Sequence, residues 1–122
     1  MLPADLVAFL QTTIKSVWAL ELLLLLRRRR GKHWSMEALV QEMRASTAIV
    51  AGGLTALSAA GLVEESAAGF GYRPATAELD VMAERLEQTY AQYPFAVTRA
   101  ILAAPDHKMQ VFADAFRLTK KD

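Results

Sequence analysis

Apolar residues recur at helical spacing from the N-terminus onward, and this pattern predicts a mainly helical protein. Asp5 is suited to cap a first helix, in which apolar side chains continue at turn spacing as far as Leu24. A second apolar stripe on the same segment consists of Trp18, Leu22 and Leu25. Apolar side chains therefore cover most of the circumference of this helix, and we expect it to lie at the centre of the fold. Arg27–Arg30 then fall in its last turn, where the helix dipole favours cations.

The middle of the chain predicts two further helices and a β-hairpin. Ser35 is positioned to cap a short helix, and after the tight turn Arg44–Ser46 another helix runs from Thr47 to Gly61. The inward positions are Met36, Leu39, Val40 and Met43 in the first and Val50, Leu54 and Leu57 in the second. The segments LVEE and FGYRP, around the turn Ser66–Gly69, are typical of two short strands. We therefore expect a mainly α fold with a small β-hairpin, in the element order of a winged helix-turn-helix.

Helical spacing returns after Pro74, and Pro94 is expected to break the helix that follows. A segment from Phe95 to Ala103 continues, and a last helix opens at Pro105. We predict one domain over residues 1–122, with a winged-helix core at about 13–75 and a C-terminal helical extension at about 76–118.

The helices outside the core have two interpretations. They either complete the fold of a single chain, or they pair with the segment Leu6–Ile14 in a symmetric dimer, which we favour. The expected dimer interface consists of Leu6, Leu10, Leu79, Met82, Leu86, Tyr90, Phe112 and Phe116.

The run of leucines before Arg27–Arg30 raises the question of a membrane anchor. The apolar stretch Thr12–Leu26 is only fifteen residues long and contains Lys15 and Glu21. A helix of that length falls short of a hydrocarbon core of about 30 Å, and a charge inside it is costly. The N-terminal MLPADL also lacks the basic region of a signal peptide. We expect no membrane partner and a cytoplasmic protein.

Composition excludes several kinds of chemistry. The absence of cysteine rules out disulfides, thiolate zinc sites and cysteine nucleophiles. The only histidines, His33 and His107, are far apart in sequence, and no motif pairs a nucleophile with a base. We expect no cofactor, no metal and no enzymatic activity. The net charge is +1, but residues 1–61 carry +3 and residues 62–122 carry −2, so the basic excess is concentrated around Arg27–Lys32.

From Ser35 to Glu65 the sequence SMEALVQEMRASTAIVAGGLTALSAAGLVEE resembles the winged-helix regulators of bacteria, such as the MarR-like group. The matching core positions are Leu39, Val50, Leu54 and Leu57, followed by Gly61-Leu62-Val63. More narrowly, GYRPATAEL and FADAFRL resemble a group of short bacterial winged-helix proteins without a defined activity. The broader resemblance implies a dimeric transcription regulator that binds double-stranded DNA, with its third helix in the major groove.

The third helix departs from that family in its outward positions. The relatives carry a Ser-Arg pair near the middle of this helix, where this chain has Ala51 and Gly52. Its outward residues are Thr47, Ala48, Ala51, Gly52, Thr55 and Ser58. None of these side chains makes the bidentate contacts that distinguish guanine or adenine. The candidate nucleic-acid-binding residues are therefore mostly elsewhere: Arg27, Arg28, Arg30, Lys32, Arg44, Thr47, Thr55 and Arg73.

Two alternatives remain open at this stage. Arg27–Arg30 are either phosphate contacts or a solvated helix end, and Gly52-Gly53 either admit another helix of the fold or mark a docking surface. The favoured function is a DNA-binding transcription regulator. The alternative is a non-enzymatic protein-interaction module on a winged-helix frame, with little or no sequence-specific DNA binding.

Overall fold

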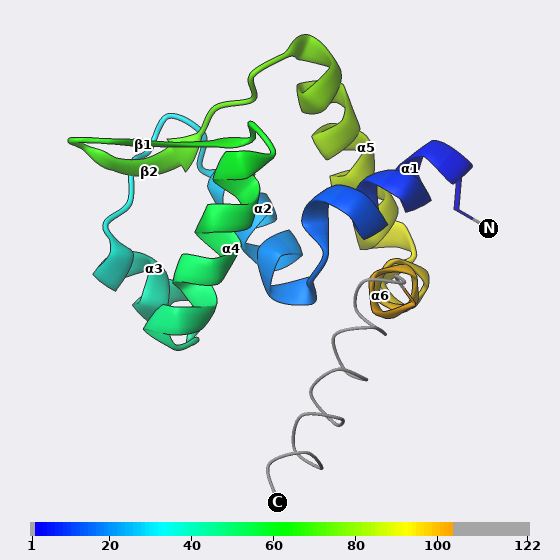
Figure 1. Cartoon of the computed structure of the whole chain (residues 1–122), viewed down its shortest axis with the longest axis horizontal. Coiled ribbons are helices and arrows are strands. Elements are labelled where there is room, and N and C mark those ends of the chain that lie inside the picture. The colour runs from blue at the N-terminus through cyan, green and yellow to red at the C-terminus, as the bar shows by residue number, and fades with distance from the viewer. Residues whose placement is uncertain (1, 104–122) are drawn as a thin grey trace, which may run out of the picture.

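The computed structural model describes residues 2–103 and is mainly helical, with one two-stranded antiparallel hairpin, as expected (Figure 1). The elements in order are α1 (Ala4–Phe9), the π-helical segment η1 (Leu10–Ile14), α2 (Val17–Arg28), α3 (Met36–Met43), α4 (Thr47–Ala59), β1 (Val63–Ser66), β2 (Gly69–Tyr72), α5 (Ala77–Gln92) and α6 (Pro94–Leu102). The last predicted helix, which contains Phe112 and Phe116, lies outside the described residues.

The predicted single helix from Asp5 to Arg30 is wrong, because the chain turns sharply at Lys15. Lys15 adopts a left-handed conformation with φ 69°, and the hydroxyl of Ser16 accepts a hydrogen bond of 3.0 Å from the Ala19 amide to start α2. The helical segments on either side meet at 100°. Continuous apolar spacing cannot reveal such a bend, because it leaves an apolar face on both segments. Asp5 also lies in the first turn of α1 rather than at its N-cap.

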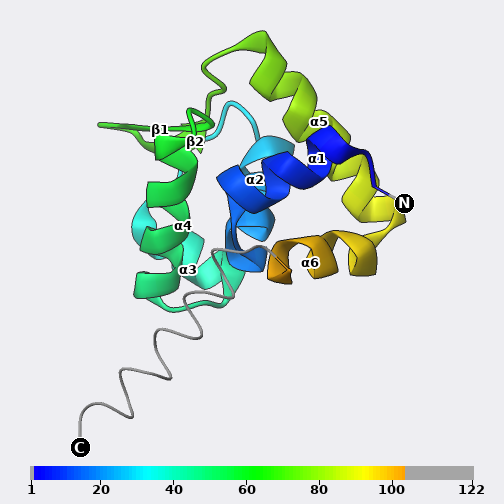
Figure 2. The ribbon, with the colours of Figure 1, turned by 45° about the vertical axis from the view of Figure 1, so that its right-hand side comes forward.

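The segment α2 is central, as predicted, and its leucines are buried on several sides. Figure 2 shows α3, α4 and the hairpin on one side of α2 and α1, α5 and α6 on the other. Gly53 of α4 faces α2: a Cβ atom added there would lie 3.1 Å from Leu22 Cδ2 and 3.7 Å from Ala19 Cα. This glycine therefore permits close packing of two helices of the same chain.

The sequence predicted the start of α3 and of α4, and it placed the end of α4 and the ends of both strands within two residues of those observed. Ser35 and Ser46 cap the two helices through their hydroxyl groups, as capping serines do. In the hairpin, Val63 pairs with Tyr72 and Ser66 with Gly69. Trp34 adds a bridge beside β2, since Trp34 and Phe70 exchange two backbone hydrogen bonds of 2.8 Å. This bridge fixes the segment between α2 and α3 against the hairpin.

The helices α5 and α6 complete the core of this chain, together with α1 and η1. Pro94 separates them and occupies the start of α6, where its missing amide hydrogen costs nothing. The guanidinium of Arg85 on α5 donates two hydrogen bonds to the Asp5 carboxylate on α1, at 2.7 and 3.1 Å. Gln11 of η1 donates to the Ala100 carbonyl of α6 at 3.1 Å. Both contacts join the two ends of the described chain.

The packing corrects part of the predicted dimer interface. Leu6, Leu10 and Leu86 are fully buried inside the chain, so they have no surface to offer a second copy. The amphipathic pattern was identified correctly, but the chain's own helices cover it. Leu79, Met82 and Tyr90 are half-buried against the same core.

Candidate functional site

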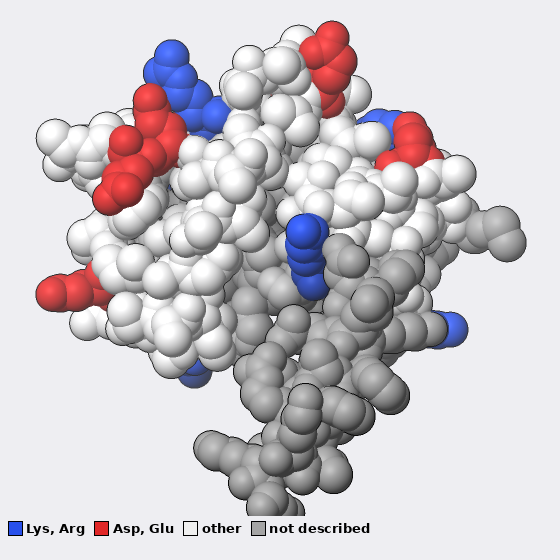
Figure 3. All heavy atoms as spheres, in the orientation of Figure 1, with Lys and Arg blue, Asp and Glu red and all other residues white. Residues whose placement is uncertain are grey.

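The exposed face of α4 carries no charged side chain and consists mainly of small residues. Its exposed positions are Thr47, Ala48, Ile49, Gly52, Thr55, Ser58 and Ala59, with Ala51 half-buried among them. A Cβ atom added at Gly52 would meet nothing within 4 Å, so this glycine, unlike Gly53, opens to solvent. Figure 3 shows a white surface over α4, with acidic side chains on the neighbouring hairpin.

A shallow groove of about 320 Å³ lies beside this face, between α3, α4 and the hairpin. It is lined by Met36, Ala51, Leu54, Thr55, Ser58, Glu65 and Phe70. Its apolar lining comes from Met36, Leu54 and Phe70, which belong to three different elements. Phe70 is held in place by the backbone bridge to Trp34. The groove is therefore a product of the fold and has no signature in any one segment of the sequence.

The hairpin contributes one carboxylate to the groove. Glu65 of β1 lines it, Glu64 is the preceding residue of the same strand, and Glu37 is exposed on α3. Arg73 is the predicted cation of the hairpin, but its guanidinium lies 3.7 Å from the Glu64 carboxylate, so part of its charge is compensated locally. Phosphates are disfavoured beside such carboxylates.

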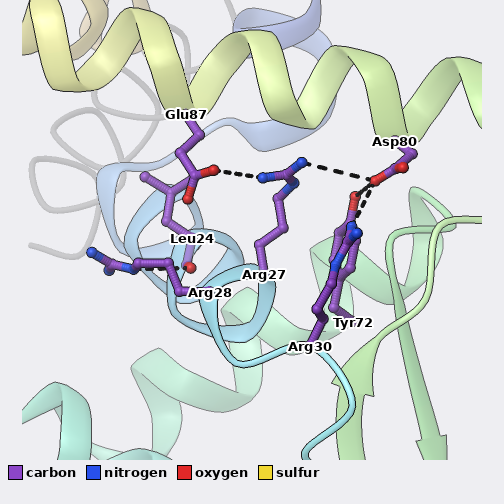
Figure 4. A network of polar contacts seen from close by, with 7 residues as sticks. All are labelled: Leu24, Arg27, Arg28, Arg30, Tyr72, Asp80 and Glu87. Atoms are coloured by element: carbon purple, nitrogen blue, oxygen red, sulfur yellow. Dashed lines mark hydrogen bonds and ion pairs between the residues drawn. The ribbon is translucent and has the colours of Figure 1, made fainter.

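Two of the four arginines at the end of α2, Arg27 and Arg30, contact carboxylates of α5 (Figure 4). Arg27 is only 10% exposed, and its guanidinium donates to the Glu87 carboxylate of α5 at 2.5 Å. Arg30 donates to Asp80 of α5 at 2.9 Å. Arg27 and Arg30 were predicted to contact phosphate; instead the structure directs both guanidinium groups to carboxylates of the same chain. The sequence could not indicate these partners, which lie 50 and 60 residues away.

Tyr72 connects this network to the hairpin. Its hydroxyl donates to Asp80 at 2.6 Å, and the guanidinium carbons of Arg27 and Arg30 lie 5.6 and 5.0 Å from its ring centroid. The Tyr72 hydrogen bond, followed by Arg30, holds the pKa of the Asp80 carboxyl below its usual value. Burial and the Asp80 carboxylate raise the pKa of Tyr72. The network thus stabilises the junction of α2, β2 and α5.

The remaining predicted contacts lie on different parts of the fold. The Nε atom of Arg28 donates to the Leu24 carbonyl of its own helix at 3.2 Å. The ammonium of Lys32 lies 3.9 Å from the Trp34 ring centroid. Arg44 is exposed at the turn between α3 and α4, and Thr55 donates to the Ala51 carbonyl. The eight candidate residues therefore do not converge on one basic surface.

Within residues 2–103, no three histidine, aspartate or glutamate side chains are grouped to hold a metal ion. In the same range, no single helix is long and apolar enough to cross a membrane. Comparisons with protein-family models, with curated proteins and with solved structures find no match to this chain.

Proposed function

We propose that this protein is a protein-interaction module built on a winged helix-turn-helix frame, and that a partner protein docks on the exposed face of α4. The order α2, Trp34 bridge, α3, tight turn, α4 and hairpin supports the winged-helix assignment. The proposal includes a cytoplasmic, non-enzymatic role.

The observation that carries the proposal is the absence of charge along α4, whose thirteen residues contain no Lys, Arg, Asn or Gln. Base reading in the major groove needs such side chains. Close protein packing instead benefits from small residues, because they allow another backbone to approach. The ion pairs of Arg27 and Arg30 with Glu87 and Asp80 also support the proposal, because they bury Arg27 and compensate part of the charge of Arg30.

The groove beside α4 suggests the chemistry of the partner. Met36, Leu54 and Phe70 provide an apolar floor, and the Glu65 carboxylate provides a negative charge. A partner segment with apolar side chains flanked by Lys or Arg complements both features.

Site-specific cross-linking tests this function. Because the chain has no cysteine, Thr55→Cys and Glu84→Cys each introduce one attachment point for a photo-crosslinker, on α4 and on α5 respectively. We expect the label at Thr55 to capture one defined protein that the label at Glu84 does not capture, and Gly52→Arg to suppress the product. Equal products from both labels, or none from the label at Thr55, would refute docking at α4.

The second candidate is a dimeric DNA-binding regulator, which the element order and the exposed cations Arg28, Lys32 and Arg44 favour. The exposed apolar side chains around α6, Phe95 above all at 78%, offer a surface for a second copy. Fluorescence anisotropy with genomic duplexes distinguishes the two candidates. A regulator that neutralises several phosphates loses affinity about a thousandfold between about 50 and 200 mM salt, whereas we expect no tight binding to begin with.

A further inference from the structure

A second hollow lies between α2 and α3, apart from the groove at α4. It has a volume of about 330 Å³ and is lined by Trp18, Glu21, Leu25, Arg28, Glu42 and Met43. Trp18 is 43% exposed here, although it belongs to an apolar stripe of a segment that the sequence predicted to be central; Trp34, by contrast, is 5% exposed. Exposure of a large indole ring in a hollow is a feature of ligand sites, which use aromatic side chains as contact surfaces.

The lining combines apolar, aromatic and charged groups. Leu25 and Met43 are half-buried and provide apolar contact, and Trp18 provides an aromatic ring. Glu21 and Glu42 bring carboxylates from two different helices. Within residues 2–103, neither carboxylate is paired with a cation. The site therefore offers two negative groups beside an aromatic ring, the combination that attracts an organic cation.

The Glu21 carboxylate is held in position by a residue that does not line the hollow. The hydroxyl of Tyr90 on α5 donates to Glu21 Oε1 at 2.7 Å, which restrains the side chain and leaves the second carboxylate oxygen without a hydrogen bond among the described residues. The guanidinium of Arg28 is held near its own helix by the Leu24 carbonyl. With Glu21, Glu42 and Arg28, the lining has a formal charge of −1, which matches one positive charge on a ligand.

From these groups we infer that the hollow binds a small organic monocation with an apolar body, such as a primary or quaternary amine. The cationic group lies over Trp18 between Glu21 and Glu42, and the apolar body contacts Leu25 and Met43. The two carboxylates oppose phosphate and other anions. The volume is at the small end of ligand pockets, which span about 300–1,000 Å³. A free amine and a lysine side chain of a partner protein share this chemistry.

Benzylamine is a suitable probe because it joins one ammonium group to an apolar ring, and benzyl alcohol and benzoate are its neutral and anionic counterparts. The chain has two tryptophans, so their indole N–H signals in an NMR titration report on Trp18 and Trp34 separately, with Trp18→Leu giving the assignment. We expect benzylamine to shift the Trp18 signal and not that of Trp34. Benzyl alcohol and benzoate should bind at least about tenfold more weakly.

A carboxylate variant with a matched control tests the charge directly. Glu42→Gln should weaken benzylamine binding by about five- to tenfold, because one of the two negative groups is lost. Glu84→Gln, which neutralises an exposed carboxylate on α5, should leave it unchanged. Circular dichroism establishes that both variants are folded.

N-acetyl-lysine amide separates the two sources of the cation. Tighter binding than benzylamine would support a lysine side chain of a partner as the ligand, and weaker binding would support a free amine. The inference is overturned if neither cation binds, if the three benzyl probes bind equally, or if Glu84→Gln weakens binding as much as Glu42→Gln. It does not depend on docking at α4, since none of the residues involved lines that groove.

Discussion

The exposed face of α4 and the C-terminal end of α2 differ sharply in charge. α4 has no charged residue, whereas Arg27–Arg30 lie at and just beyond the end of α2. Yet Arg27 and Arg30 form ion pairs with the carboxylates of Glu87 and Asp80 on α5. The comparison shows that the density of basic residues in a sequence does not measure the positive charge available to a ligand. What matters is which carboxylates the fold brings beside them.

The largest expected effect concerns the two neighbouring glycines of α4. Gly53→Leu places a side chain where a Cβ atom already lies 3.1 Å from Leu22 Cδ2, so α4 must move away from α2. We expect a loss of about 3 kcal/mol in the free energy of unfolding, measured by chemical denaturation. A loss below about 0.5 kcal/mol would mean that α4 does not pack on α2 at this position.

The next largest effect is a difference in stability between variants of Arg27 and of Arg29. Arg27→Ala leaves Glu87 without its partner and removes a largely buried side chain. We expect a loss of about 2 kcal/mol, below the value for a fully buried pair because Glu87 is partly exposed. Arg29→Ala, at an exposed position without an ion pair among residues 2–103, should change stability by less than about 0.5 kcal/mol. Equal losses in denaturant titrations of the two variants would contradict the network.

A smaller effect of opposite sign is expected at Gly52. Because its Cβ position is open and its backbone is helical, Gly52→Ala should increase the free energy of unfolding by about 0.5–1 kcal/mol. Thermal denaturation measures the change. A destabilised Gly52→Ala variant would show that this face is covered in the isolated protein.

The smallest expected effect is the loss of stability at alkaline pH when the Tyr90 hydroxyl of α5, which donates to Glu21 of α2, loses its proton. The hydrogen bond to Glu21, followed by burial, raises the pKa of Tyr90 to about 12. A raised pKa stabilises the folded protein fully below the unfolded value of about 10, and this contribution disappears as the pH rises from about 10 to about 12. Tyrosinate absorbance should show one tyrosine titrating near the upper value, and Tyr90→Phe should remove it. Persistence of that late titration in Tyr90→Phe would assign it elsewhere.

The sequence predicted the elements whose boundaries have local chemical signals. Ser35 and Ser46 cap α3 and α4, the turn at Ser66–Gly69 closes the hairpin, and Pro94 separates α5 from α6. The bend at Lys15 was missed, because apolar spacing continues through it and a left-handed lysine has no sequence signature. Local signals therefore define the elements better than the angles between them.

The site was less predictable for a related reason. The outward face of α4 follows from helical periodicity, and five of its six predicted residues are exposed; Ala51 is half-buried, and the exposed Ile49 and Ala59 were missed. The partners of Arg27 and Arg30 depend on tertiary packing, as does the burial of Leu6, Leu10 and Leu86 in the chain's own core. Periodicity identifies an apolar face, but it does not reveal whether the same chain or a second copy covers it.

The most direct test of docking at α4 is an amide-resolved NMR titration at about 150 mM salt, with duplex DNA in one series and the protein captured by the label at Thr55 in the other. The backbone amide signals of Gly52, Thr55 and Ser58 should change with the protein partner and remain unchanged with DNA. Changes at these three residues on addition of DNA, with none on addition of the protein, would contradict the proposed function.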